Sequence, residues 1–86
     1  MEKEIFDALC NIINQSFEQY YGLREIKPED SLKDLGFNSI AFIKIMILIE
    51  ERFDIEIDDN ETEVSDYKTI GDIVKLVSQK INNKNI

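Results

Sequence analysis

The segment 39–53, with the sequence SIAFIKIMILIEERF, is the most apolar stretch of the chain and contains neither glycine nor proline. A run of this length without a helix breaker predicts one continuous helix from Ser39 to about Phe53, and Asn38 is a typical N-cap residue. A helix has about 3.6 residues per turn, so one side of it should enter a core. The residues expected on that side are Phe42, Ile45, Met46, Ile49 and Phe53.

The same helix has a second apolar side. Ile40, Ile43 and Ile47 fall outside the core stripe, on the flank that carries the start of the helix. Lys44, Glu50 and Glu51 border them. Two interpretations remain open for this side. Either the short segment 61–67 covers Ile43 and Ile47, or these isoleucines stay exposed and bind a partner.

A glycine turn with the sequence DLGFN, at 34–38, delivers Ser39 to the first turn of this helix. The first N–H groups of a helix lack intrahelical partners and carry partial positive charge, so an anionic group bonded to Ser39 would be stabilised there. A serine at a helix start is far more often an ordinary first-turn residue. Ser39 alone therefore predicts no function.

Apolar residues at helical spacing predict a first helix from Lys3 to about Tyr20, ended by Gly22. A long loop at 23–37 follows. Its apolar anchors are Leu32 and Leu35.

The C-terminal part begins with a break at 58–60, followed by a short helical turn at 61–67. The sequence TIGD at 69–72 is a capping box that opens a last helix to about Ile81. The tail at 82–86 is expected to fray. Together the elements predict an all-α fold, a small four-helix bundle with three long helices and one short one, and a single domain over 1–86 whose core spans about 3–81.

Composition excludes several classes of function. The chain has 86 residues and a net charge of −8, which disfavours nucleic acid and anionic membranes as partners. No apolar run approaches the ~20 residues needed to cross a bilayer, and the sequence starts without a secretory signal, so we expect a cytoplasmic protein and a monomer. The chain has no histidine and one cysteine, Cys10. Without the usual general base, a non-enzyme is the simplest prediction.

The acidic stretch at 50–66 contains nine carboxylates and one arginine. It is first of all a solvated surface, although it could also steer the chain toward basic partners. An EF-hand starting at Asp54 is excluded because Asp59 occupies the glycine position and Ser65 the glutamate position. We assign no metal. Lys68, just before the last helix, could contact a partner or a phosphate attached to Ser39, but a solvated lysine is the favoured interpretation.

Three short motifs occur in a recognisable order: DSL at 30–32, DLGFNSI at 34–40 and IEERFDIEI at 49–57. With this spacing the chain resembles the acyl and peptidyl carrier proteins over nearly its whole length. The resemblance implies that Ser39 receives 4'-phosphopantetheine from coenzyme A through a phosphopantetheinyl transferase. It also implies that the thiol of this arm holds acyl or aminoacyl groups as thioesters.

The chain departs from the pattern of fatty-acid carriers, which usually have Asp before the serine and a strongly acidic helix after it. Here Asn38 precedes the serine, and Ala41, Phe42 and Lys44 replace much of the acidity. In these residues the chain resembles carriers of polyketide, nonribosomal peptide or related pathways. An adenylation enzyme or an acyltransferase attaches the acyl or aminoacyl group to such carriers, and synthase or tailoring enzymes act on it afterwards. The predicted docking residues are Asn38, Ile40, Ile43, Lys44 and Ile47.

The main alternative is an unmodified acidic interaction domain that binds a partner through the second apolar side of the helix. Both interpretations share the same fold. They differ at Ser39, which a carrier requires and an adaptor does not.

Overall fold

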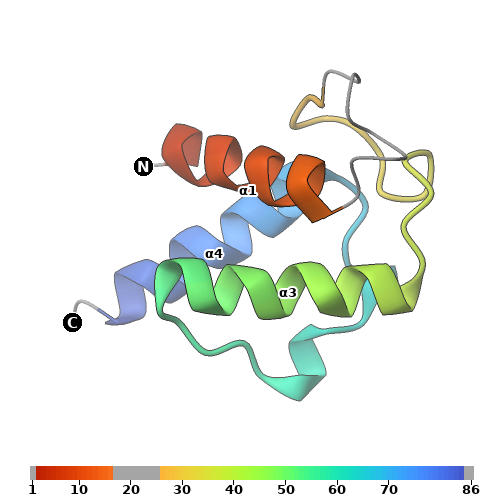
Figure 1. Ribbon diagram of the computed structural model, residues 1–86. Coiled ribbons are helices and arrows are strands. Elements are labelled where there is room, and N and C mark those ends of the chain that lie inside the picture. Colours follow the sequence, from red (N-terminus) through yellow and green to blue (C-terminus); the bar gives the residue numbers. More distant parts are fainter. Residues whose placement is uncertain (1, 17–25, 85–86) are drawn as a thin grey trace.

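The computed structural model describes residues 2–16 and 26–84 of the chain. Three α-helices dominate it: α1 (Glu2–Ser16), α3 (Ser39–Phe53) and α4 (Ile70–Lys84) (Figure 1). The predicted all-α bundle is confirmed. The predicted bounds of the helix beginning at Ser39 are also confirmed.

The short fourth helix expected at 61–67 consists of two 3-10 helices, η1 (Asp59–Glu61) and η2 (Val64–Asp66), which lie between α3 and α4 in the chain. The expected continuation of the first helix to Tyr20 and its end at Gly22 lie outside the described residues. So does the start of the loop after it.

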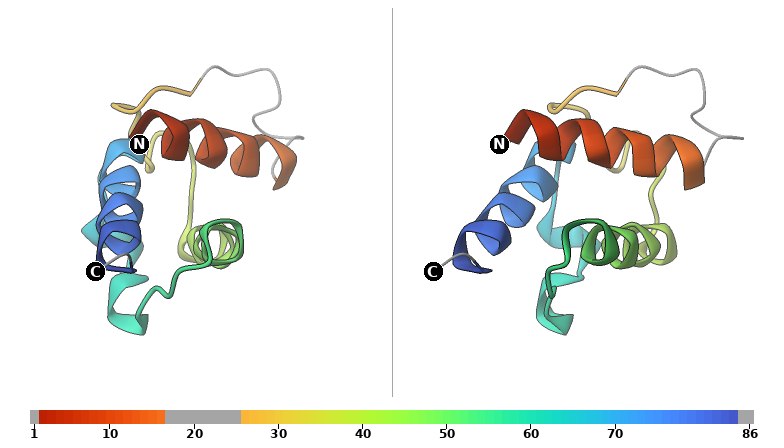
Figure 2. Two further views of the ribbon diagram at one scale, coloured as in Figure 1. Left: turned by 90° about the vertical axis from the view of Figure 1, so that its left-hand side faces the viewer. Right: turned by 60° about the vertical axis from the view of Figure 1, so that its left-hand side comes forward.

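The core is formed by the apolar sides of all three α-helices. In α3, Phe42, Ile45, Met46 and Ile49 are at most 1% exposed, as the stripe predicts, whereas Phe53 is only partly buried. α1 packs against both α3 and α4 and lies across them in two views (Figure 2). The buried residues of the other two helices are Ile5, Ala8, Leu9 and Ile13 in α1, and Ile70, Ile73, Val74, Leu76 and Val77 in α4.

The loop before α3 is anchored in this core. Leu32 and Leu35 are buried, as predicted, and Phe37 joins them. Gly36 has a φ of 84°, a left-handed conformation that glycine adopts without steric cost. The resulting turn is closed by hydrogen bonds from the N–H of Gly36 to the carbonyl of Lys33 (3.0 Å) and from the N–H of Phe37 to that of Leu32 (3.1 Å).

This loop pairs with the segment that precedes α4, so two parts of the chain far apart in sequence run side by side (Figure 1). Ser31 and Thr69 form an isolated antiparallel bridge. The N–H of Gly71 donates to the carbonyl of Pro28 at 2.8 Å. A Cβ at position 71 would come within 3.2 Å of that oxygen, which explains a glycine in the first turn of α4.

The predicted capping box of the last helix is confirmed. The N–H of Asp72 donates to Oγ1 of Thr69 (3.3 Å), and the Asp72 carboxylate accepts the N–H groups of Lys68 (2.9 Å) and Thr69 (3.2 Å). These backbone donors, Lys68 first, lower the pKa of Asp72.

The end of the last helix was predicted wrongly. α4 extends to Lys84, three residues beyond Ile81, so 82–84 are helical and do not fray. A contact between distant residues accounts for the difference. Nζ of Lys84 donates to the backbone carbonyl (2.6 Å) and the carboxylate (2.8 Å) of Asp54, the left-handed C-cap of α3.

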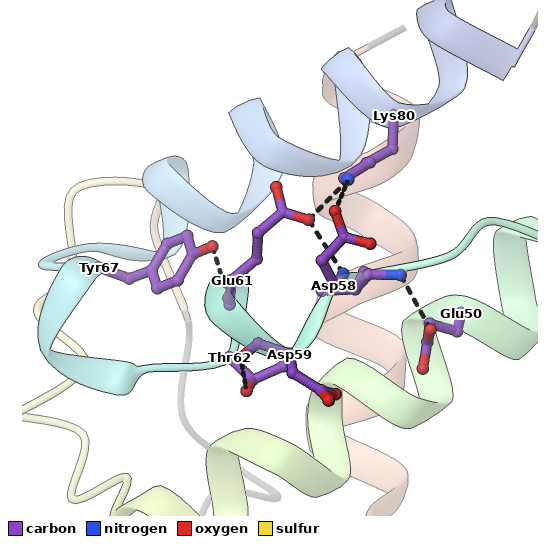
Figure 3. A network of polar contacts seen from close by, with 8 residues as sticks. Glu50, Asp58, Asp59, Glu61, Thr62, Tyr67 and Lys80 are labelled. Atoms are coloured by element: carbon purple, nitrogen blue, oxygen red, sulfur yellow. Dashed lines mark hydrogen bonds and ion pairs between the residues drawn. The ribbon is translucent and has the colours of Figure 1, made fainter.

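A polar network ties the segment between α3 and α4 to both helices (Figure 3). Nζ of Lys80 lies 2.6 Å from the Glu61 carboxylate, and this contact lowers the pKa of Glu61. The Tyr67 hydroxyl donates to the carbonyl of Glu61 at 2.8 Å. On the other side, the Glu50 carboxylate of α3 accepts the N–H of Ile57 at 2.9 Å. The connecting segment is thereby held at both ends.

The two sides of α3 predict a sharp contrast in stability. Ile45 is fully buried, so we expect Ile45→Ala to lower the free energy of unfolding by about 2–5 kcal/mol. Ile47 is 50% exposed, so Ile47→Ala, the matched control, should stay within about 0.5 kcal/mol of the parent chain. Urea unfolding followed by circular dichroism measures both. Equal losses of stability in the two variants would contradict the placement of Ile45 on the core side of α3 and of Ile47 on the exposed side.

Candidate functional site

Ser39 is the first residue of α3, and its side chain is exposed. Asn38 precedes it in an extended conformation as the N-cap of the helix, as predicted. The Asn38 side-chain oxygen accepts the N–H of Ala41 at 2.8 Å, and its backbone carbonyl accepts the N–H of Phe42 at 3.0 Å. The structure thus presents one hydroxyl at the tip of a well-capped helix.

Two buried aromatic residues hold this helix start in place. Phe37 immediately precedes the N-cap, and Phe42 lies four residues after it, which are the positions of a hydrophobic staple. Both belong to the buried core, with exposures of 7% and 0%. Because the chain is anchored on each side of Ser39, the exposed stretch between the two rings is short and fixed in direction.

The electrostatics of this helix start suit a phosphate bonded to Ser39. Asn38 satisfies the N–H of Ala41, while the N–H groups of Ser39 and Ile40 have no partner in the described part of the chain. The first turn of α3 contains no acidic residue that would neutralise the positive end of the helix dipole. An exposed hydroxyl next to free donors fits a covalently attached phosphodiester.

Beside Ser39, three isoleucines form an exposed apolar strip, which we call the isoleucine ridge: Ile40, Ile43 and Ile47. Their side chains are 78%, 44% and 50% exposed. The segment 61–67 therefore leaves Ile43 and Ile47 exposed, which rules out the first of the two interpretations, while binding of a partner at this surface stays a prediction. Spacings of three, four and seven residues place all three on one side of α3.

Charge is distributed unevenly along α3. Lys44, beside the isoleucine ridge, is exposed, and Asn38 is exposed at its start. The carboxylates of the helix, Glu50 and Glu51, occur only in its last turn. The five predicted docking residues are all exposed, and the exposed Glu51 lies one turn beyond Ile47 at the far end of this side of α3.

Other candidate groups offer no competing site. Cys10 is partly buried in α1, and this burial raises the pKa of its thiol, as expected for a packing residue. Over residues 2–16 and 26–84, no three His, Cys, Asp or Glu side chains are placed to hold a metal ion. In the same ranges, no helix is long and apolar enough to cross a membrane.

Comparison with known proteins decides the family. The family model described as the phosphopantetheine attachment site (PP-binding) matches residues 7–77. The chain belongs to the phosphopantetheine-binding carrier proteins. An acyl carrier protein of Prochlorococcus marinus (strain MIT 9515) is 32% identical over 80 residues, which cover 92% of this chain and 95% of the relative.

A solved structure supports the fold. The crystal structure of an acyl carrier protein from Thermotoga maritima matches with a TM-score of 0.79 at 24% sequence identity, covering 95% of this chain and 92% of that one. The carrier resemblance seen in the sequence motifs is therefore confirmed, and so is the bundle. Membership of the family also confirms the cofactor, a covalently attached 4'-phosphopantetheine.

Sequence reasoning missed a groove of about 670 Å³ next to this site. One wall comes from the loop at 31–38 and the other from the segment 64–69, and Asn38 lies at its edge. We call it the lysine groove, after Lys33 and Lys68 among its lining residues. The groove depends on the pairing of Ser31 with Thr69, and no local sequence signal encodes that pairing.

The N-cap of α3 can be tested directly. Asn38→Ala removes the acceptor for the N–H of Ala41, so we expect a loss of about 1 kcal/mol in the free energy of unfolding. Asn38→Asp keeps the acceptor and places a negative charge at the helix start, so it should be at least as stable as the parent carrier. Urea unfolding of the two variants provides the measurement. If Asn38→Asp lost as much stability as Asn38→Ala, the capping role would be refuted.

Proposed function

We propose that Ser39 is the residue to which phosphopantetheine is attached, and that the chain carries acyl or aminoacyl groups as thioesters on this arm. The observation that carries the proposal is the exposed Ser39 at the start of α3. The N–H groups of Ser39 and Ile40 have no partner among residues 2–16 and 26–84, and the first turn of α3 contains no carboxylate. The attached arm supplies a terminal thiol that forms thioesters. The chain itself supplies the attachment point and a surface for recognition.

Ser39 acts in this proposal as an attachment point and not as a catalyst. The sequence contains no histidine, the usual base for activating a serine. A phosphopantetheinyl transferase therefore has to remove the proton from the Ser39 hydroxyl. The non-enzyme prediction rests on the same reasoning.

The isoleucine ridge is the proposed docking surface, together with Asn38 and Lys44 at its border. An exposed apolar strip next to the attachment point lets a partner enzyme bind the helix while it acts on the arm. The partners proposed are the transferase, a loading enzyme of the adenylation or acyltransferase type, and downstream synthase or tailoring enzymes. Cytoplasmic location and a monomeric state remain predictions.

A flexible tether gives such a carrier its physical advantage. A group bound covalently to the arm meets each docked active site as an intramolecular substrate, at high effective concentration. Docking can then be weak and reversible. A surface of three isoleucines suits this requirement, since it is far smaller than the interface of a permanent complex.

We further propose a polyketide, nonribosomal peptide or related pathway, and not housekeeping fatty-acid synthesis. The support comes from the docking surface, where Asn38, Ala41 and Lys44 stand in place of the acidic residues usual in fatty-acid carriers. Recognition of this surface depends mainly on apolar contact.

The attachment site predicts a clear result in mass spectrometry. After incubation with coenzyme A and a broad-specificity phosphopantetheinyl transferase, the chain should gain the mass of one phosphopantetheine. Ser39→Ala should gain none, because the acceptor hydroxyl is absent. Ser65→Ala is the matched control, since Ser65 is also exposed but lies in η2, and it should be modified like the parent chain.

Two results would contradict the proposal. Modification of Ser39→Ala would place the arm on another residue. If the folded parent chain stayed unmodified while a control carrier was modified, the unmodified interaction domain would be the better interpretation.

The pathway predicts a separate result. Purified fatty-acid synthesis enzymes should load and elongate the modified chain much more slowly than their own carrier, because α3 offers them no acidic residue in its first turn. Rates of malonyl loading and of elongation on the two carriers provide the measurement. Equal rates would overturn the proposed pathway and leave the attachment site untouched.

A further inference from the structure

Residues 58–67, which we call the strap, connect two buried parts of the chain without contributing a buried residue themselves. Ile57 before the strap is 8% exposed and Ile70 after it is 0% exposed, whereas none of the residues from 58 to 69 is buried. The strap lies at the outer edge of the bundle (Figure 1, Figure 2). Segments with few buried apolar contacts open at a lower free energy than the core of a protein. We therefore expect the strap to be the least stable connection between the helices α3 and α4.

Both ends of the strap are fixed to other elements. At its start, the Glu50 carboxylate of α3 accepts the N–H of Ile57 at 2.9 Å. At its end, the N–H of Lys68 donates to the Asp72 carboxylate at 2.9 Å, and the carbonyl of Lys68 accepts the N–H of Leu32 at 3.0 Å. An opening of the strap is therefore confined to the residues between Ile57 and Lys68.

Between these ends, the polar contacts of the strap converge on Glu61 (Figure 3). Nζ of Lys80 lies 2.6 Å from Oε1 of Glu61, and the same oxygen accepts the N–H of Asp58 at 3.0 Å. The carbonyl of Glu61 accepts the Tyr67 hydroxyl at 2.8 Å. The side chains of Lys80 and Glu61 are 21% and 26% exposed, so their contact is better shielded from water than an ordinary surface ion pair. Because Lys80 belongs to α4, this contact joins both halves of the strap to a helix of the bundle.

The strap also supports the start of α3. Val64 and Tyr67 are partly buried against the core, and the Tyr67 ring packs on Phe42 with 5.2 Å between the ring centroids. Phe42 is 0% exposed and flanks the cap that precedes Ser39. Opening of the strap therefore takes the Tyr67 ring away from Phe42 and changes the surface beside Ser39. The helix itself remains anchored by its other buried residues.

We propose that the strap opens as one unit while the three α-helices stay folded, and that the contact between Lys80 and Glu61 is the latch that keeps it closed. The latch couples the C-terminal half of α4 to the surroundings of Ser39. A partner that binds Lys80 or Glu61 more tightly in the open state would shift the strap toward that state. This inference goes beyond the proposed function and does not depend on the group attached to Ser39.

Hydrogen exchange of backbone amides, followed by NMR on the folded chain, tests the strap. The N–H groups of Glu61, Thr62 and Tyr67 form hydrogen bonds within the strap, and those of Ile49 and Val77 report on the bundle. We expect the strap amides to exchange with one common opening free energy that is lower than that of the bundle amides.

Variants of the lysines of α4 test the latch. Lys80→Gln removes the ion pair, so the strap amides should exchange roughly tenfold faster, while the bundle amides change less than about twofold. Glu61→Gln should have the same effect, and the double variant should add little to either, because the two side chains act as one pair. Lys84→Gln is the matched control, since Lys84 binds the carboxylate of Asp54, which precedes the strap. Lys80→Gln should also shift the amide resonance of Phe42, and Lys84→Gln should leave both this resonance and the strap amides unchanged.

Three results would count against the proposal. If the strap amides exchanged with the free energy of the bundle amides, or each with a different one, the strap would not open as a unit of its own. If Lys80→Gln and Lys84→Gln accelerated the strap amides equally, Lys80 would not be the latch. An unchanged Phe42 resonance in Lys80→Gln would overturn the coupling to the start of α3. None of these results bears on attachment at Ser39, which mass spectrometry tests separately.

Discussion

Burial of one side of α3 is the interaction on which the rest of the structure depends. Phe42, Ile45, Met46 and Ile49 are fully buried against the other helices, so the orientation of α3 about its axis is fixed. The isoleucine ridge must then face outward, and the first residue of the helix, Ser39, emerges beside it. Leaving three isoleucines exposed to water costs free energy, and the proposed docking of partner enzymes on this ridge would give the exposure a function.

The two ends of α3 are secured by different means. At the start, Asn38 caps the helix, and buried Phe37 and Phe42 flank the cap. At the end, Asp54 adopts a left-handed conformation with a φ of 54° and binds Lys84 of α4. A helix held at both ends presents Ser39 and the isoleucine ridge as one rigid surface, while the attached arm supplies the flexibility that transfer between enzymes requires.

Features with a local cause could be predicted from the sequence. The bounds of α3, its N-cap and the capping box at Thr69 and Asp72 follow from residue type and helical spacing. The second apolar side of α3 follows in the same way, but its exposure depends on where the segment 61–67 packs. Features that depend on contacts between residues far apart in the sequence could not be predicted. The bridge between Ser31 and Thr69 creates the lysine groove, and the contact of Lys84 with Asp54 extends α4 beyond its expected end. In each case the partners lie at least 30 residues apart.

The central claim is that α3 presents Ser39 as the attachment point of the arm. Its most direct test is to purify the protein from the cells that make it and to locate the modification by fragmentation mass spectrometry. The account predicts one phosphopantetheine on the peptide that contains Ser39, and any acyl group still bound to its thiol would identify the cargo. Phosphopantetheine on a different residue, or an unmodified chain in cells whose other carriers are modified, would contradict it.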